Sequence, residues 1–130
     1  MQRIVVIGGV AAGLKAAAKV RRLDAEAQIT VLERGELVSY GACGLPYFIG
    51  GEVEQVRQLM SSPSGALRTP EFFKKAKNLD VLTRMEAVAI EREAKIVHAL
   101  NLETGAKQQF AYDKLVLATG ASPLKPAWPG

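Results

Sequence analysis

Hydrophobic residues open the chain as a continuous run, and further along they spread into helical and alternating patterns. Residues 3–8 (RIVVIG) are almost entirely apolar and β-branched, which is typical of a buried strand. The alanine-rich residues 11–23 have the length and propensity of a helix, and residues 27–33 (AQITVLE) predict a second strand. A strand, a glycine turn, a helix and a strand in this order predict a βαβ unit, which implies a parallel sheet with a right-handed crossover.

The middle of the chain has a weaker pattern. Residues 45–49 predict a short helix, in which Pro46 is restricted to the first turn. Residues 61–70 are rich in proline, serine and glycine and predict a loop. The proline that ends this loop also starts a helix, which we expect to extend to about Asn78.

Short strands are expected in the last third. They are predicted at residues 81–82, 86–91, 96–100 and 109–112. Thr104-Gly105 marks a hairpin turn, so we interpret these strands as a small antiparallel meander. Residues 114–118 (KLVLA) predict another buried strand. The expected fold class is therefore α/β, a Rossmann-like parallel sheet with helices and a small antiparallel β-meander insertion. Residues 121–130 contain three prolines and are expected to be a linker, as in a fragment of a longer protein.

Composition narrows the kind of protein. A chain of 130 residues with 48% hydrophobic content is ordinary for one globular domain, which buries about two-thirds of its unfolded surface. One cysteine excludes a disulfide scaffold and fits a reducing compartment, so a cytoplasmic protein is expected. The apolar run at residues 4–12 is too short to span a bilayer, and no signal peptide is recognisable.

The net charge of +4 leaves two explanations open. An aromatic content of 6%, without aromatic residues alternating with basic ones, argues against nucleic acid as a partner. The basic residues gather near two predicted helix ends, where they are solvated and favourable to the helix dipole. Alternatively, the first cluster binds a phosphate-bearing ligand. The two clusters are Lys19, Arg21 and Arg22, and Lys74, Lys75 and Lys77.

A glycine-rich turn after the first strand predicts a dinucleotide site. In the run Gly8-Gly9-Val10-Ala11-Ala12-Gly13, Gly8 makes the tight turn and Gly13 allows the helix to pack closely on the strand. Val10 stands where the usual pattern has glycine, so its side chain must point away from the phosphates. The free backbone N–H groups from about Val10 to Ala12 would hold a pyrophosphate.

Glu33 follows Gly13 by 20 residues, at the end of the second strand. A carboxylate at this point accepts hydrogen bonds from both ribose hydroxyls and repels a 2′-phosphate, which favours FAD or NAD over NADP. Arg34 next to it keeps the NADP alternative open. The other explanation for the whole pattern is a glycine-rich turn without a ligand and a surface glutamate.

Cys43 is the only cysteine and lies in the glycine-flanked run SYGACGLPY. Without a second cysteine, a redox cycle must use a mixed disulfide, a sulfenic acid or a persulfide. A short helix from Gly44 onward would favour the thiolate, and Gly41, Ala42 and Gly44 would leave room for a flat cofactor or a disulfide substrate. The alternative is a buried structural cysteine. His98 lies in an alternating strand and is expected to be structural, and no metal site is predicted.

Three strings carry a resemblance to a known family. IVVIGGVAAG, SYGACGLPYFIGG and LVLATGASP resemble the flavin-dependent pyridine nucleotide-disulfide oxidoreductases. Within that family the cysteine motif is similar to the single-cysteine branch of coenzyme A-disulfide reductases, NADH oxidases or peroxidases, and NADH-dependent persulfide reductases. The Val10 variant of the glycine pattern also occurs in this branch.

The resemblance implies a role for individual residues. Cys43 would be the redox-active sulfur next to the flavin, and Ser39 and Arg22 would contact the substrate. Some coenzyme A-disulfide reductases carry asparagine just before the cysteine, whereas this chain has Ala42. The implied FAD-binding residues are Gly8, Val10, Ala11, Ala12, Gly13, Glu33, Arg34, Ala87, Ala118, Thr119 and Gly120.

The resemblance also implies what the longer enzyme does. Residues 1–130 would be the N-terminal part of its FAD-binding domain, and an NADH domain and a C-terminal dimerisation domain would lie outside this chain. The longer enzyme, a homodimer, would pass electrons from NADH through FAD to a disulfide, a coenzyme A disulfide or a persulfide by way of Cys43. The chain alone would then be inactive. The alternatives are an NADH oxidase or peroxidase that uses a cysteine sulfenic acid, and a non-catalytic dinucleotide-binding module. Neither a nucleic acid nor a membrane partner is expected.

Overall fold

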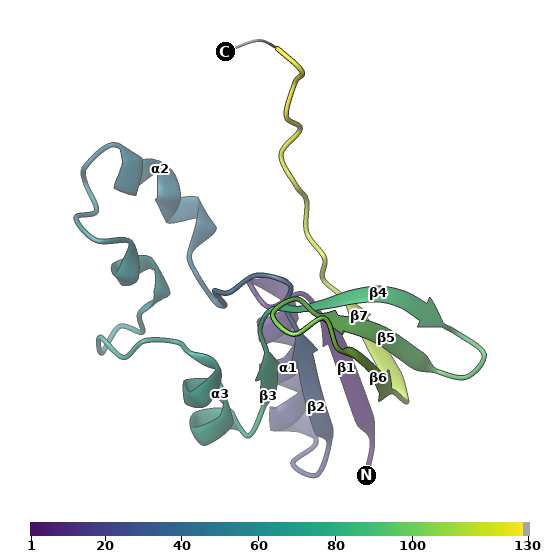
Figure 1. Ribbon diagram of the computed structural model, residues 1–130. Helices are drawn as coiled ribbons and strands as arrows, with labels where there is room; N and C mark the ends of the chain where they lie inside the picture. The colour runs from purple at the N-terminus through teal and green to yellow at the C-terminus, as the bar shows by residue number, and fades with distance from the viewer. Residues whose placement is uncertain (129–130) are drawn as a thin grey trace.

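The computed structural model describes residues 1–128 and contains two sheets with helices beside them (Figure 1). The first sheet is parallel, with the strand order β3-β2-β1-β7, and the second is an antiparallel meander of β4, β5 and β6. The strands are β1 (Arg3–Ile7), β2 (Gln28–Leu32), β3 (Asp80–Leu82), β4 (Met85–Glu91), β5 (Ile96–Asn101), β6 (Lys107–Ala111) and β7 (Lys114–Leu117). The helices are α1 (Ala12–Leu23), α2 (Leu45–Ile49), α3 (Pro70–Lys77) and two short 3-10 helices, η1 (Ala42–Gly44) and η2 (Val56–Met60). The predicted α/β fold class is confirmed.

Strand β1 is apolar throughout because both of its faces are covered. Successive side chains of a strand point to opposite faces of the sheet. Ile4 and Val6 belong to one cluster of buried residues, which also includes residues of α1 and α3. Val5 belongs to a second cluster, shared with the antiparallel sheet. Burial on both sides is the usual reason why strands of parallel sheets form continuous hydrophobic runs.

Local sequence signals define the ends of α3. Thr69 precedes the helix, and its Oγ1 accepts a hydrogen bond from the N–H of Phe72 at 3.2 Å. Pro70 occupies the first turn, where a missing N–H costs nothing. The helix ends at Asn78, whose φ of 47° is left-handed. The predicted helix from Pro70 to about Asn78 is therefore confirmed.

The prediction for residues 81–82 was wrong in one respect. These residues do not belong to the antiparallel meander, because β3 pairs in parallel with β2, with Thr30 opposite Asp80. Three residues are too few to show a periodicity, so their partner is decided by tertiary packing. The helix η2 was also absent from the prediction, since residues 56–60 show neither a helical nor a strand pattern.

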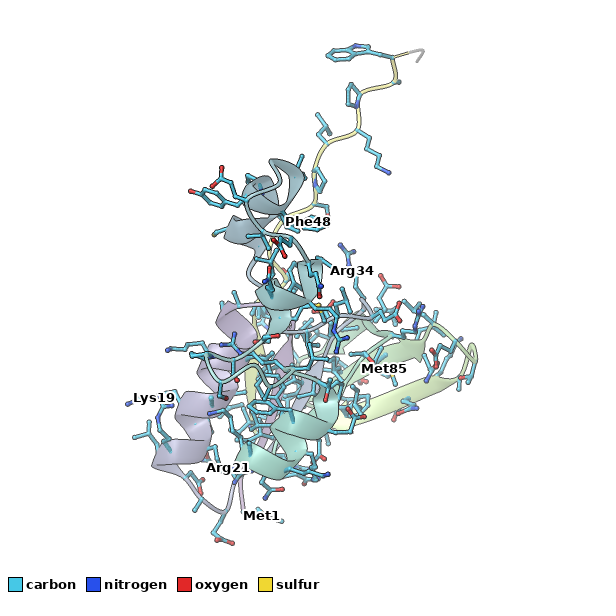
Figure 2. The ribbon with its side chains drawn as sticks, turned by 90° about the vertical axis from the view of Figure 1, so that its left-hand side faces the viewer. Met1, Lys19, Arg21, Arg34, Phe48 and Met85 are labelled. Atoms are coloured by element: carbon cyan, nitrogen blue, oxygen red, sulfur yellow. The ribbon has the colours of Figure 1, made fainter. Side chains whose placement is uncertain are left out.

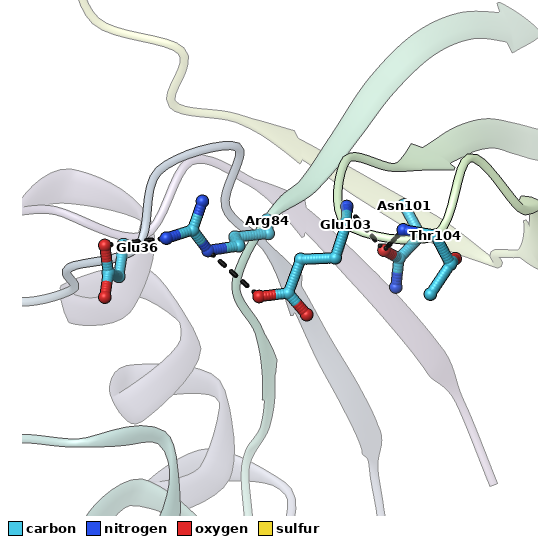
Figure 3. A network of polar contacts seen from close by, with 5 residues as sticks. All are labelled: Glu36, Arg84, Asn101, Glu103 and Thr104. Carbon is cyan, nitrogen blue, oxygen red and sulfur yellow. Dashed lines mark hydrogen bonds and ion pairs between the residues drawn. The ribbon is translucent and has the colours of Figure 1, made fainter.

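Arg84 connects the loop after β2 to the turn between β5 and β6 (Figure 3). It lies between β3 and β4 with a left-handed φ of 51°. Its guanidinium contacts Glu36 Oε2 at 2.8 Å and Glu103 Oε1 at 3.1 Å. Glu103 belongs to the predicted hairpin turn, in which Asn101 Oδ1 accepts hydrogen bonds from two backbone N–H groups. These contacts connect the antiparallel sheet to the loop after β2.

The projecting parts of the molecule are α2 and the C-terminal tail. Figure 1 shows α2 lying away from the sheets, and Figure 2 labels Phe48 on it, far from Arg21 on α1. Residues 121–128 have no helix or strand and are exposed, as expected for a linker, while residues 129–130 of that prediction lie outside the described part. Within residues 1–128, no helix has the length and apolar character needed to cross a membrane.

Candidate nucleotide, cysteine and basic-pocket sites

The glycine turn is built for close backbone contact. Gly8 has a φ of +109°, and a Cβ at this position would overlap the carbonyl oxygen of Ala118. A Cβ on Gly13 would overlap the carbonyl oxygen of Gly8 in the same way. Gly8 thus lets the end of β1 approach the residues after β7, and Gly13 lets α1 pack on β1. These are the packing roles that the glycine pattern predicts.

The first turn of α1 leaves its backbone donors free of side-chain caps. Ala11, the residue before the helix, makes no side-chain hydrogen bond, and the first turn holds no acidic residue. Ala11 and Ala12 are exposed. A helix start of this kind presents N–H groups and a positive dipole end to an anion.

Glu33 is almost completely buried, with 9% of its surface exposed. Its Oε2 accepts a hydrogen bond from the N–H of Gly9 at 2.7 Å, and its Oε1 accepts one from the N–H of Gly35 at 2.7 Å. The carboxylate therefore holds the glycine turn and the loop after β2 together. Each carboxylate oxygen has a second lone pair, so both remain able to accept a further hydrogen bond from a ligand.

A pocket of about 240 Å³ lies beside Glu33, where β1, β2 and β7 end and β4 begins. We call it the nucleotide pocket. It brings together six of the predicted cofactor residues from four separate parts of the chain. Arg34 crosses to the tail and donates a hydrogen bond from Nη2 to Ser122 Oγ at 2.9 Å, a contact that the sequence did not indicate. The lining residues that the sequence predicted are Gly8, Glu33, Arg34, Ala87, Thr119 and Gly120.

Cys43 is exposed and lies in the middle of η1, immediately before α2. This position excludes the alternative of a buried structural cysteine. At Gly44 the direction in which a Cβ would point is filled, because a Cβ there would overlap Cδ2 of Leu59. The packing of η2 against η1 therefore requires glycine at this position, and its predicted role in substrate access stays a prediction.

A second, larger pocket of about 470 Å³ lies between α1, α3 and the loop before Cys43. Ser39 and Arg22, the predicted substrate residues, both line it. Its other lining residues include Lys15, Arg68 and Lys77, and none of its described lining residues is acidic. We call it the basic pocket. Val10 and Ala11 line it as well, and they do not line the nucleotide pocket.

The two neighbouring arginines near the end of α1 have different surroundings. Arg21 donates from Nη2 to the carbonyl oxygen of Asn78 at 2.9 Å and so fastens α1 to the end of α3. Arg22 lines the basic pocket. In the first basic cluster, one arginine therefore joins two helices and the other lines the basic pocket. Sequence reasoning missed Arg68 because it lies in a loop without a recognisable motif.

His98 lies on β5 beside an acidic residue, and its expected structural role stays a prediction. Its Nε2 lies 3.4 Å from Glu91 Oε2 on the neighbouring strand β4. Among residues 1–128, no group of three or more histidine, cysteine, aspartate or glutamate side chains is placed to hold a metal ion.

The sequence matches the family described as Pyridine nucleotide-disulphide oxidoreductase over residues 2–130. The chain belongs to this family. Coenzyme A disulfide reductase from Staphylococcus haemolyticus (strain JCSC1435) is 38% identical over 121 residues, which cover 93% of this chain and 26% of that protein. The predicted resemblance to the single-cysteine branch is confirmed, and the family members are oxidoreductases.

Solved structures give the same result. A NAD-dependent persulfide reductase from A. fulgidus superposes with a TM-score of 0.92 at 50% identity, covering 96% of this chain and 23% of that one. A water-forming NADH oxidase from Lactobacillus brevis, bound to NADH, gives a TM-score of 0.87 at 29% identity, covering 100% of this chain and 27% of that one. The chain thus spans about a quarter of the length of these relatives.

Proposed function

We propose that this chain is the FAD-binding, cysteine-bearing N-terminal part of an NADH-dependent flavoprotein that reduces coenzyme A disulfide or a coenzyme A persulfide. One observation carries the proposal. The loop that bears exposed Cys43 also lines the basic pocket through Ser39, Tyr40 and Gly41, and it is tied to the glycine turn by a hydrogen bond from the N–H of Ser39 to the carbonyl oxygen of Gly9 at 3.0 Å.

The residues around the glycine turn fit FAD. The uncapped first turn of α1 suits a pyrophosphate, and the close approach at Gly8 leaves no side chain in its way. Glu33 retains acceptor capacity for the ribose hydroxyls, and Ala87 offers a small apolar surface in the nucleotide pocket. Thr119 and Gly120, which follow β7, line the same pocket. We place the NADH site, and the homodimer contacts, in parts of the longer protein outside this chain.

The basic pocket supports coenzyme A as the carrier of the sulfur. Coenzyme A bears a pyrophosphate and a 3′-phosphate, and the pocket presents four cationic side chains, Lys15, Arg22, Arg68 and Lys77. Peroxide and oxygen have no phosphate groups with which these cationic side chains could pair. The names of the relatives, a coenzyme A disulfide reductase and a persulfide reductase, support the same class of substrate.

The chemistry follows from a single thiol. The Cys43 thiolate attacks one sulfur of coenzyme A disulfide, the sulfur–sulfur bond breaks, and one coenzyme A leaves as its thiolate while the other stays in a mixed disulfide with Cys43. Two electrons and one proton then give back the Cys43 thiolate and release the second coenzyme A as a thiol. NADH is the reductant, and FAD, when bound, supplies these two electrons to the mixed disulfide.

The full-length protein tests the substrate. We expect NADH oxidation with coenzyme A disulfide, and loss of that activity in Cys43→Ser. Arg22→Ala should raise KM for coenzyme A disulfide about tenfold, the equivalent of one charge-assisted contact, and leave a small uncharged disulfide unaffected. Lys19→Ala is the matched control, because Lys19 is an exposed cation of the same helix that does not line the basic pocket.

A second candidate is an NADH oxidase or peroxidase, favoured by the likeness to the Lactobacillus brevis enzyme and by the exposure of Cys43, which would cycle through a sulfenic acid. Turnover with peroxide or oxygen alone, and none with coenzyme A disulfide or persulfide, would select it. FAD binding is tested separately by the visible spectrum of the protein after FAD is added. Failure of both the chain and the longer protein to take up FAD would contradict both candidates and favour a non-catalytic module.

A further inference from the structure

We propose that Leu59 of η2 is the positioning residue for Cys43. This inference rests on the proposed function, since it concerns how the sulfur is presented to a ligand in the basic pocket. Cys43 itself is exposed, so its place depends on the residues beside it. Two of these residues, Gly41 and Gly44, are both held by Leu59.

The first contact is made by the backbone. The N–H of Gly41 donates a hydrogen bond to the carbonyl oxygen of Leu59 at 2.7 Å. Gly41 in turn accepts a hydrogen bond from the N–H of Gly44 at 2.8 Å, which closes the 3-10 turn around Cys43. The turn is therefore anchored at its start to η2.

The second contact is made by the side chain. Gly44 has a φ of −86° and a ψ of −11°, which any residue can adopt, so glycine is not needed there for backbone conformation. It is needed for space, because a Cβ on Gly44 would overlap Cδ2 of Leu59. Leu59 thus packs directly on the residue after Cys43, and this contact fixes the end of the turn.

Helix η2 connects this anchor to the basic pocket. The N–H of Arg68 donates to the carbonyl oxygen of Met60 at 2.9 Å, and Ser61 forms a bridge with Leu67. Arg68, which lines the basic pocket, is therefore tied to the residue that follows Leu59. The backbone on both sides of Cys43 and the backbone of Arg68 are thus anchored to adjacent residues of η2, and a bound disulfide requires such a fixed arrangement for in-line attack.

The test measures the first exchange step at the only cysteine, without reductant. The rate constant of Cys43 with coenzyme A disulfide is divided by that with bis(2-hydroxyethyl) disulfide, which has no phosphate, and the unfolding temperature is measured in parallel. Leu59→Ala should lower this ratio about tenfold, because loss of precise placement slows only the reaction of a bound reactant. Leu59→Met, which keeps the volume, should restore most of it. Val56→Ala, an exposed apolar residue of the same helix, should leave the ratio unchanged.

A double-mutant cycle isolates the contact. Gly44→Ala should lower the ratio in the wild-type background, but it should have little further effect when Leu59 is already alanine, because the space is then free. Additive effects of the two substitutions, or equal slowing of both disulfides with a lower unfolding temperature, would overturn the positioning role.

A failure of the proposed function can be told apart from a failure of the positioning role. If the wild-type chain shows no preference for coenzyme A disulfide, the proposed substrate is wrong. The anchoring role of Leu59 is then tested by hydrogen exchange at the Gly41 amide. Faster exchange in Leu59→Ala than in Val56→Ala supports the anchor, and equal exchange in the two variants refutes it.

Discussion

Replacement of Glu33 by glutamine removes one charge from the best-buried polar group of the described chain and leaves its shape. The carboxylate accepts two short hydrogen bonds, from the N–H groups of Gly9 and Gly35, both at 2.7 Å. An amide keeps one oxygen, so one N–H retains a neutral acceptor, and the other N–H faces an NH₂ group. Hydrogen bonds to charged groups contribute about 1.5–3 kcal/mol, and an unsatisfied buried donor costs about 1–3 kcal/mol. We therefore expect Glu33→Gln to reduce the free energy of unfolding by about 2–4 kcal/mol.

The assay is thermal unfolding followed by circular dichroism at pH 7. For a domain of this size the expected loss corresponds to a fall in Tm of about 10 °C. Glu26→Gln, at an exposed glutamate just before β2, is the matched control and should change Tm by less than about 2 °C. If Glu33→Gln unfolded within about 2 °C of the wild-type protein, the carboxylate would not hold the glycine turn in the way the structure describes.

Substitutions at Gly13, Asp113 and Arg84 test other contacts of the fold. Gly13→Ala should reduce the free energy of unfolding, measured with denaturant, by about 3 kcal/mol or more, because its Cβ would overlap the backbone oxygen of Gly8 and also approach Val6 Cγ1. An unchanged free energy of unfolding would contradict the close packing of α1 on β1. The guanidinium of Arg3 donates a hydrogen bond to the carboxylate of Asp113, and this contact is the main reason why the pKa of the Asp113 carboxyl is lowered to about 2. The pair should therefore contribute its full stabilisation above about pH 4 and lose it as the pH falls to about 2. In urea unfolding, Asp113→Asn should be less stable than the wild-type protein at pH 6 and equally stable near pH 2. Arg84→Ala should reduce the free energy of unfolding by about 1 kcal/mol in urea unfolding, because it breaks two exposed ion pairs. Arg92→Ala, at an exposed arginine in a turn, is the control. Equal effects of the two substitutions would contradict a stabilising role of the Arg84 contacts.

Sequence reasoning succeeded where the determining interactions are local. The unit β1–α1–β2 was predicted because glycine spacing, alanine content and apolar runs all act within about 33 residues of one another. The placement of β3 was wrong because its pairing with β2 depends on residues 50 positions away, and three residues carry no period. The glycine pattern and its spacing to Glu33 predicted two residues that line one pocket, Gly8 and Glu33, whereas Arg68 and Leu59 were missed. The roles that we propose for these two depend on how η2 and the following loop pack beside Cys43, and no spacing rule encodes that packing.

The placement of β1 between β2 and β7 has a consequence for how the chain acquires its fold during synthesis. One side of β1 finds its partner early, since β2 ends at Leu32, but Lys114 begins β7 82 positions later. At about 5–20 residues per second, the ribosome needs roughly 4–16 s to make that stretch. Throughout this interval the central strand exposes an unpaired, strongly apolar edge. Nascent chains are therefore most vulnerable to association with one another, and most in need of a chaperone, before residue 117 emerges from the exit tunnel.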